Sequence, residues 1–528
     1  MAKVTTALAE ELQKESALEG AKFWSRTAPW MVAGFGVLMI VAFIALDRVA
    51  PADRRLVKIR GEDPVAYFGM AHSVLFDHDF DLSNEFRNVP PVARWWTANQ
   101  PRTGLPGSPW GLGYSFLETP LLAVGSGLDA WSGGHGDGYG SAAVFCYCLG
   151  TVIFAGLGLV ALFFLLKEAG AEWGLEDEER RSKYALLLTL ATYWGTNVGF
   201  YSFSQMGHSA TFLFSCLFLL VWWRIRERTA LGRWFLLGLI GGMLSICRWQ
   251  DVLELGIPLM YDLGGGNLAA AAREKWKSRL IYAAGAALWW IPQAAEFKAI
   301  YGSYVTVPQA GYFSFPPSHF WQVLFSTQSG WVAWTPLIGL GLAGLLWAAA
   351  RRPRLYVPLL LVLTMQVVVV GSISFWDGIG SFSSRYLNSL TPMAAVGAMV
   401  LWRVTGRRAR FGLTALGLIF CAFTTMFAIE YGLYLAPTTV RMTFSEYVTD
   451  KFRPFDLYRR KSAVRTANEL LDQGKTGKAI DTLEGALRYG DDREVYQILE
   501  TACRNAGRIE EADRFREKRE EFLRGELF

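Results

Sequence analysis

The chain has 528 residues, of which 52% are hydrophobic and 14% aromatic, and its formal net charge is +5. This composition excludes an ordinary soluble domain, because apolar runs recur at the length of about 20 residues that a helix needs to cross a hydrocarbon layer of about 30 Å. The six cysteines have no metal-site spacing and indicate no disulfide framework. The modest net charge gives no reason to expect a nucleic-acid partner.

The apolar runs predict an all-α, polytopic membrane protein with about eleven transmembrane helices. The first 28 residues are polar and mixed in charge, without the apolar core of a signal peptide, and we expect them to form a cytoplasmic segment. The expected spans lie near residues 29–48, 140–166, 184–203, 209–223, 234–248, 250–262, 280–297, 331–350, 355–374, 386–402 and 411–434.

The basic loops orient these spans. If the amino terminus is cytoplasmic, every short loop rich in Arg and Lys falls on the same side, as the positive-inside rule requires. The opposite, extracytoplasmic side then receives the long loop 51–138, the shorter loops near residues 204–207, 298–330 and 375–385, and the chain beyond residue 435. The basic loops are RRSK (180–183), RIRER (224–228), REKWKSR (273–279), RRPR (351–354) and RVTGRRAR (403–410).

The first outer loop, 51–138, is unusually acidic just after the first span. Asp63 and Tyr67 stand four residues apart, so a helix would place them on one face. The stretch LFDHDFDLSNEF (75–86) alternates Asp77, Asp79 and Asp81 before Glu85, a spacing that can hold Ca²⁺ or a carbohydrate. Leu82 stands where an EF-hand turn needs glycine, and simple solvation is the alternative for each acid. A divalent cation on Asp77, Asp79 and Asp81 is therefore one hypothesis. Farther along, Tyr114 to Trp131 predicts an interfacial helix.

Other outer segments add polar groups. His208 follows Gln205 at a helix junction, where a simple helix cap is the alternative. CRWQDVLELG (247–256) places Arg248, Asp251 and Glu254 between apolar runs, where ionisable residues usually face a cavity or a partner. A structural Arg248–Asp251 pair is the alternative. The aromatic loop 301–336 fits a cavity lid or an interfacial belt, and FWDGIGSFSSRYLNSLTP (375–392) carries Asp377 and Arg385 to the mouth of a span; Arg suits a phosphate.

After residue 435 the composition becomes charged, and we expect a separate extracytoplasmic domain over 436–528. LLDQGKTGKAIDTLEGAL and ACRNAGRIEEADRFREKR align with a 33-residue offset, which sets Gly474 on Gly507 and Ala479 on Ala512. Small residues there let paired helices approach closely, as in one or two tetratricopeptide-type repeats. Such a domain would contact a protein partner.

In the order of its segments the chain resembles bacterial GT-C-type membrane glycosyltransferases, the superfamily that includes protein O-mannosyltransferases and lipid A aminoarabinose transferases. The resemblance covers roughly residues 25–435. It depends on GEDPVAY after the first span, QMGHSA, VLFSTQSGWVAWTP and SFSSRYLNSLTP.

The resemblance implies an enzyme of the bacterial inner membrane that moves a sugar, with inversion, from a polyprenyl-phosphate carrier to a glycan, lipid or protein acceptor on the extracytoplasmic face. It implies Asp63 as catalytic base; Glu62 before it and Pro64 after it depart from the pattern and keep the later acids as alternatives. We expect Arg248 or Arg385 to hold the phosphate. The other expected substrate contacts are Tyr67, Asp79, Asp81, Glu85, His208, Asp251 and Tyr386.

Two other functions fit the same segments. In a transporter or lipid flippase, Arg248, Asp251 and Glu254 would line a pathway, although the sequence shows no inverted repeat. In a membrane-anchored assembly factor the repeat domain would do the work, but an anchor does not need so many acids and arginines in its outer loops.

The loop charges generate a first prediction, on topology. A periplasmically active reporter fused after Phe528 should be active, because one span follows the basic loop 403–410. The same reporter inserted in that loop is the control and should be inactive. Activity of the carboxyl-terminal fusion only with a reporter that works in the cytoplasm would contradict the proposed orientation.

Overall fold

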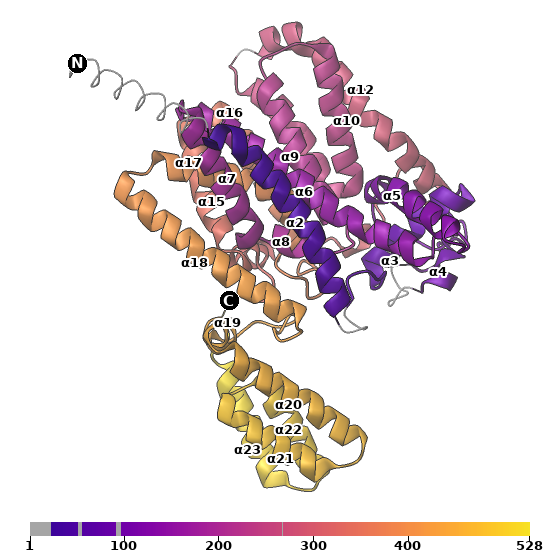
Figure 1. Cartoon of the computed structure of the whole chain (residues 1–528), viewed down its shortest axis with the longest axis vertical. Helices are drawn as coiled ribbons and strands as arrows, with labels where there is room; N and C mark the ends of the chain where they lie inside the picture. The colour runs from indigo at the N-terminus through magenta and orange to yellow at the C-terminus, as the bar shows by residue number, and fades with distance from the viewer. Residues whose placement is uncertain (1–22, 51–54, 91–96, 267, 528) are drawn as a thin grey trace, which may run out of the picture.

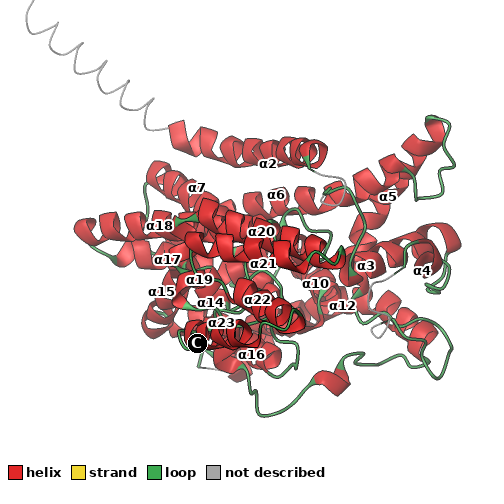
Figure 2. Cartoon of the chain, turned by 90° about the horizontal axis from the view of Figure 1, so that it is seen from below, coloured by secondary structure: helices red, strands yellow, loops and turns green. Residues whose placement is uncertain are grey.

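The structure is a computed structural model that describes residues 23–50, 55–90, 97–266 and 268–527, so most of the expected cytoplasmic segment 1–28 lies outside the described residues. Within these ranges the chain is all-α, as predicted, with three isolated bridges and no strand (Figure 2). The α-helices are α2 (Phe23–Val49), α3 (Glu62–His72), α4 (Glu85–Asn88), α5 (Leu112–Trp131), α6 (Ser141–Glu172), α7 (Glu178–Gly195), α8 (Asn197–Tyr201), α9 (His208–Ile225), α10 (Leu231–Cys247), α11 (Ile257–Leu263), α12 (Leu268–Tyr301), α13 (Phe320–Phe325), α14 (Trp331–Trp334), α15 (Leu337–Arg351), α16 (Pro353–Gly371), α17 (Thr391–Val404), α18 (Arg407–Gly432), α19 (Phe444–Tyr447), α20 (Pro454–Asp472), α21 (Thr476–Ala486), α22 (Arg493–Asn505) and α23 (Ile509–Leu523).

The long helices from α2 to α18 form one bundle, and the protein is a polytopic membrane protein (Figure 1). By length and composition, five described helices can cross a membrane, namely α2, α6, α9, α16 and α18, while α10 and α15 are shorter apolar helices. Burial separates them by position. The apolar window of α6 is 67% buried, whereas the windows of α2 and α18 are only 17% buried. An exposed apolar helix face needs lipid around it, so α2 and α18 form the outside of the bundle.

The expected span 250–262 is not one helix. A 3₁₀ segment, η3 (Trp249–Gly256), follows a break at Arg248, and the seven-residue α11 continues it. The segment still runs from one end of the bundle to the other, because Tyr261 donates a hydrogen bond to Glu227, which follows the far end of α9. A tight 3₁₀ segment this long is uncommon and often marks a functional position.

Helix α5 confirms the helix expected at 114–131, and Pro120 does not interrupt it. It packs on α6, where Gly125 lies so close to Ala142 and Ala143 that a side chain there would meet their backbone. Helix α3, at the start of the first outer loop, packs in turn on α5. Every residue of α3 from Asp63 to His72 is buried, so the acidic segment is a fixed part of the bundle.

The last four helices have a hydrophobic core of their own, formed by residues such as Ile480, Leu483 and Leu499. They lie at the end of the bundle where α2 and α18 end (Figure 1). The residues aligned by the 33-residue offset are structurally equivalent. Gly474 and Gly507 each adopt positive φ, 72° and 76°, after α20 and α22. Ala479 and Ala512 are both fully buried near the starts of α21 and α23. Two similar helix pairs therefore form this domain, whose assignment to the tetratricopeptide type stays a prediction.

Close backbone contact between α15 and α17 generates a second prediction. A Cβ atom on Gly344 would lie 1.9 Å from the carbonyl oxygen of Gly397, with no flexible side chain to move aside. Gly344→Ala should therefore force the helices apart and lower the unfolding temperature in detergent, at a cost of about 1–3 kcal/mol for overpacking. Gly412→Ala is the matched control, because a Cβ atom on this helical glycine would have no other atom within 4 Å. Equal unfolding temperatures for the two variants would contradict this packing.

Candidate active site

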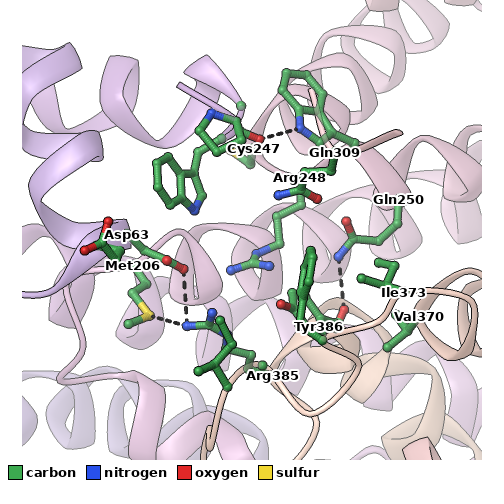
Figure 3. A pocket seen from close by; sticks show the side chains of 18 of the residues that line it. Asp63, Met206, Cys247, Arg248, Gln250, Gln309, Val370, Ile373, Arg385 and Tyr386 are labelled. Atoms are coloured by element: carbon green, nitrogen blue, oxygen red, sulfur yellow. Dashed lines mark hydrogen bonds and ion pairs between the residues drawn. The ribbon is translucent and has the colours of Figure 1, made fainter. Parts of the chain in front are cut away.

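A cavity of about 260 Å³ opens at the end of the bundle beside the first outer loop (Figure 3). Its walls come from segments far apart in the chain: the start of α3, the turn before α5, the break after α10, the end of α16 and the 3₁₀ segment η5 (Arg385–Leu390). Five of the predicted site residues line it together, namely Asp63, Tyr67, Arg248, Arg385 and Tyr386.

Asp63 stands in the first turn of α3, where the partial positive charge of the helix amino terminus favours a carboxylate. Gly61 precedes the helix with φ of 90°, a conformation that glycine adopts without strain and that lets the chain turn into α3. The Asp63 side chain is almost buried, and its Oδ2 lies 3.2 Å from Nη1 of Arg385 (Figure 3). The Asp63 side chain is therefore held in one orientation at the cavity wall.

Arg385 begins η5 and reaches the cavity from the other side. Its Nη1 also contacts the sulfur of Met206 at 3.4 Å, and its Nε has no hydrogen-bond partner among the described residues. Asp377, which the sequence carries to the same span mouth as Arg385, accepts a hydrogen bond from Gln328 at 2.7 Å. The guanidinium group of Arg385 thus pairs with an acid of the first outer loop, Asp63.

Arg248 occupies the break between α10 and η3, in an extended conformation with φ of −148°. Its Nη2 lies 3.1 Å from Nε2 of His208. Because a guanidinium can only donate, Nε2 accepts, and His208 is in the neutral form with its proton on Nδ1. Arg248 makes no ion pair with any described carboxylate, including Asp251. It brings to the cavity a positive charge that no described carboxylate contacts as an ion pair.

Two tyrosines complete the polar wall. The ring of Tyr386 lies beside both arginines (Figure 3), and its centroid is 5.6 Å from the guanidinium carbon of Arg248 and 5.5 Å from that of Arg385. Tyr67 follows Asp63 by one helical turn, as its spacing predicted, and packs edge-on against Tyr114. Burial raises the pKa of Tyr67, so its phenol stays protonated and can donate a hydrogen bond.

The structure does not bring the other predicted residues to the cavity surface. His208 lies behind Arg248 as its hydrogen-bond acceptor. Asp251 is buried and accepts from Ser389 at 2.8 Å. Asp79 accepts from the Ser73 hydroxyl, Asp81 from the backbone of Ser83, and Glu85 contacts His72, and these three acids lie outside the cavity.

Several lining residues were missed by the sequence reasoning. Val369 and Val370, in the last turn of α16, and Ile373, which follows the helix, form an apolar wall. In the sequence they are part of a uniform apolar run, which gives no sign that its last turn lines a cavity. Gln250 has a clearer signal, since it follows Arg248 in the polar interruption; its amide donates to the carbonyl of Tyr386 at 3.2 Å.

No protein-family model matches the chain, and no curated protein matches it. Among solved structures it is similar to the apo oligosaccharyltransferase of Archaeoglobus fulgidus, with 12% identity and a TM-score of 0.49 over 78% of this chain and 56% of that one. The same archaeal enzyme, AglB, in complex with an inhibitory peptide and a dolichol-phosphate gives a TM-score of 0.48 at the same identity and coverage.

A third similar structure is ArnT from Cupriavidus metallidurans bound to undecaprenyl phosphate, with 12% identity and a TM-score of 0.47 over 89% of this chain and 77% of that one. The chain spans little more than half of the length of the archaeal enzymes that it matches. With TM-scores below 0.5, what the cavity does must be inferred from its own residues.

Proposed function

We propose that the cavity transfers a sugar from a polyprenyl-monophosphate carrier to an acceptor hydroxyl, as a GT-C-type glycosyltransferase. The observation that carries the proposal is that the ion-paired carboxylate of Asp63 and two guanidinium groups, those of Arg248 and Arg385, converge on one cavity at the end of a membrane bundle. Glu62 lines the same cavity as a second acid. A carboxylate can accept the proton of a hydroxyl group, and guanidinium groups can hold a phosphate at two oxygens.

Arg248 is the first phosphate ligand in this proposal. Its charge is not paired with a described carboxylate, and its hydrogen bond to neutral His208 orients the group without neutralising it. Burial among apolar segments makes an unpaired charge costly, so an anionic ligand would be favoured there. The apolar wall from the end of α16 gives the carrier chain a surface of its own kind.

The reaction balances with the residues present. The acceptor oxygen attacks the anomeric carbon of the sugar while its proton passes to the carboxylate of Asp63. The bond between that carbon and the phosphate oxygen breaks, and its electron pair stays on the phosphate, where Arg248 and Arg385 stabilise the charge. One displacement inverts the anomeric carbon. Phosphate is a good leaving group, so the site needs no acid on that side.

The Asp63–Arg385 ion pair gives Arg385 two tasks. It orients Asp63 before the reaction, and its positive charge lies close enough to the base to stabilise the negative charge that develops on the departing phosphate. The solved structures named above include complexes with dolichol-phosphate and undecaprenyl phosphate. Dolichol-phosphate and undecaprenyl phosphate are ligands of the two similar proteins, and the proposal for this chain depends on the residues of its own cavity.

The location and partners are part of the proposal. We place the cavity and the helices α20 to α23 on the extracytoplasmic side of a bacterial inner membrane, as the basic loops indicate. Helix α3, whose start lines the cavity, and helices α20 to α23 lie toward the same end of the bundle (Figure 1). On the extracytoplasmic side, no nucleotide-sugar pool exists and a lipid must bring the sugar. The acceptor is a hydroxyl of a glycan, a lipid or a protein, and α20 to α23 contact a protein partner.

Loss of the base is the third prediction. Asp63→Asn should lower donor turnover by about 10²- to 10⁴-fold, because it removes the proton acceptor and keeps an oxygen for Arg385. The measurement is release of polyprenyl monophosphate from a panel of polyprenyl-monophosphate sugars, in membranes that supply the native acceptors. Thermal unfolding in detergent shows whether the variant is folded.

The control is Asp456→Asn, which makes the same change in the first turn of another helix, α20, away from the cavity. It should turn over donor like the parent. Near-parental turnover by Asp63→Asn would exclude Asp63 as the base and make Glu62, the other acid that lines the cavity, the next residue to test.

The arginines generate a fourth prediction. Arg248→Lys keeps the positive charge but loses the planar guanidinium that can donate to two phosphate oxygens at once. It should lower kcat/KM for the donor about tenfold or more. Each charge-assisted contact is worth about 1.5–3 kcal/mol, and about 1.4 kcal/mol corresponds to a factor of ten. Arg385→Lys should also lower kcat at saturating donor, because Arg385 positions Asp63. The measurement is rate against carrier-lipid concentration with acceptor saturating.

Arg224→Lys is the matched control. Arg224 lies at the far end of α9 from His208 and pairs with Glu168. Parental donor dependence in both cavity variants would exclude the two arginines as the phosphate ligands.

A further inference from the structure

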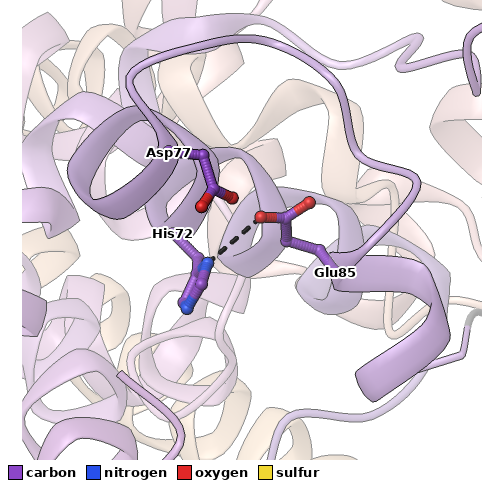
Figure 4. A group of neighbouring side chains, drawn as sticks. All are labelled: His72, Asp77 and Glu85. Carbon is purple, nitrogen blue, oxygen red and sulfur yellow. Dashed lines mark hydrogen bonds and ion pairs between the residues drawn. The ribbon is translucent and has the colours of Figure 1, made fainter. Parts of the chain in front are cut away.

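Away from the cavity, at the other end of α3, three potential ligands face one another. His72, Asp77 and Glu85 each offer one ligand atom, and these atoms all lie within 4.8 Å of one another (Figure 4). His72 ends α3, and about 1.5 Å of rise per residue places it some 13 Å along the helix from Asp63. None of the three lines the cavity, so the cluster is separate from the proposed active site.

A change in helix type brings Asp77 into the cluster. In an α-helix, residues five apart point about 140° away from each other, at about 100° per residue. After His72, however, the chain continues as one π-helical turn, η2 (Ser73–Asp77), which ends at His78 with φ of 58°. A π-helix pairs residues five apart, so Asp77 returns to the side of His72. Such turns are rare and frequently found at functional sites.

The hydrogen bonds of His72 define which nitrogen faces the acids. Nε2 lies 2.8 Å from the carbonyl oxygen of Asp137, so it must carry a proton and donate. Nδ1 then points at Oε1 of Glu85, 3.1 Å away. In a neutral ring this nitrogen carries a lone pair toward a carboxylate. A cation between them, or a second proton on the ring, is needed to make the contact favourable.

Glu85 supplies an independent observation. Its side chain is 2% exposed, and Oε2 has no hydrogen-bond partner among the described residues. The neighbouring Asp77 is exposed and accepts a hydrogen bond from Asn84. Two carboxylates beside one imidazole carry more negative charge than a single imidazolium can balance. A divalent cation would satisfy both acids and reach the site from solvent past Asp77.

We propose that His72 Nδ1, Asp77 and Glu85 bind a divalent transition-metal ion of the Zn²⁺ type. Zn²⁺ takes imidazole nitrogen and carboxylate oxygen at about 2.0–2.2 Å, which in a tetrahedral site separates ligand atoms by roughly 3.3 Å. The 3.1 Å between Nδ1 and Oε1 fits this edge. The Asp137 carbonyl bonded to Nε2 provides the outer contact that orients a metal-bound histidine. Imidazole favours Zn²⁺ over Ca²⁺, which prefers oxygen ligands.

The surroundings hold the cluster in place. The rings of Tyr139 and Phe76 lie 4.4 Å and 4.7 Å from the His72 ring. A Cβ atom on Gly138 would lie 2.8 Å from Cδ2 of His72, so only glycine lets the chain cover the ring this closely. The ion would tie the end of α3 to α4, which begins at Glu85. Its role is therefore to fix the helix that carries Asp63.

The test measures binding of Zn²⁺ to the purified full chain in detergent after removal of metal with a chelator. We expect about one Zn²⁺ retained per chain and a higher unfolding temperature when Zn²⁺ is restored. Asp77→Asn and Glu85→Gln should each weaken Zn²⁺ at least about tenfold, since loss of even an outer contact costs about 10- to 100-fold. Asp77 is exposed, so its variant tests the site even if Glu85→Gln fails to fold.

Asp81→Asn is the matched control, an acid of the same loop that lies outside the cluster, and it should bind Zn²⁺ like the parent. Absence of saturable Zn²⁺ binding, equal affinities in all three variants, or stabilisation by Ca²⁺ in place of Zn²⁺ would each overturn the proposal. In the first two cases His72 and Glu85 form only an ion pair, and in the third the cluster binds a cation that prefers oxygen ligands.

Discussion

The ion pair between Asp63 and Arg385 joins the first outer loop to the last part of the bundle, and the cavity depends on it. Asp63 comes from the first helix after the first membrane segment, and Arg385 from the 3₁₀ segment that leads into α17. Neither element could form the site alone. Once the pair forms, Tyr67 follows from the helical spacing of α3, and Tyr386 from its place beside Arg385.

Breaks in helices supply the rest of the polar surface. A regular helix uses all of its backbone groups internally, and irregular backbone is tolerated at membrane depth only where protein or a water-filled cavity surrounds it. Arg248 stands at such a break, between α10 and η3, and Arg385 begins η5. The two charges proposed to hold the phosphate are thus placed where the helices stop, and the apolar helices around them remain uninterrupted.

Much of this arrangement could be predicted from the sequence, because it depends on local patterns. Hydropathy predicts the helices, and i,i+4 spacing places Tyr67 with Asp63. The cost of a charge among apolar runs singles out Arg248, and the place of Arg385 at the mouth of a span singles out the second arginine. Which side chains pair across long distances in the sequence could not be predicted from such local patterns. Arg248 was expected to have Asp251 as its alternative partner, yet Asp251 faces Ser389 and the arginine faces His208. The choice depends on how η3 turns, and a 3₁₀ segment has a different period from the helix that the pattern implies.

In the acidic stretch 75–86, too, the sequence pattern did not predict which side chains lie together. The alternating spacing predicts that Asp77, Asp79 and Asp81 form one group. That prediction assumes an extended chain, whereas the segment forms a π-helical turn followed by loops, which point the three side chains in different directions. The turn moves Asp77 toward His72, while Asp79 and Asp81 bond locally to Ser73 and Ser83. Helix α3 is then held at both ends, by Arg385 at Asp63 and by Glu85 at His72. A base on a helix held at both ends loses little freedom when substrate binds, which is what positioning a proton acceptor requires.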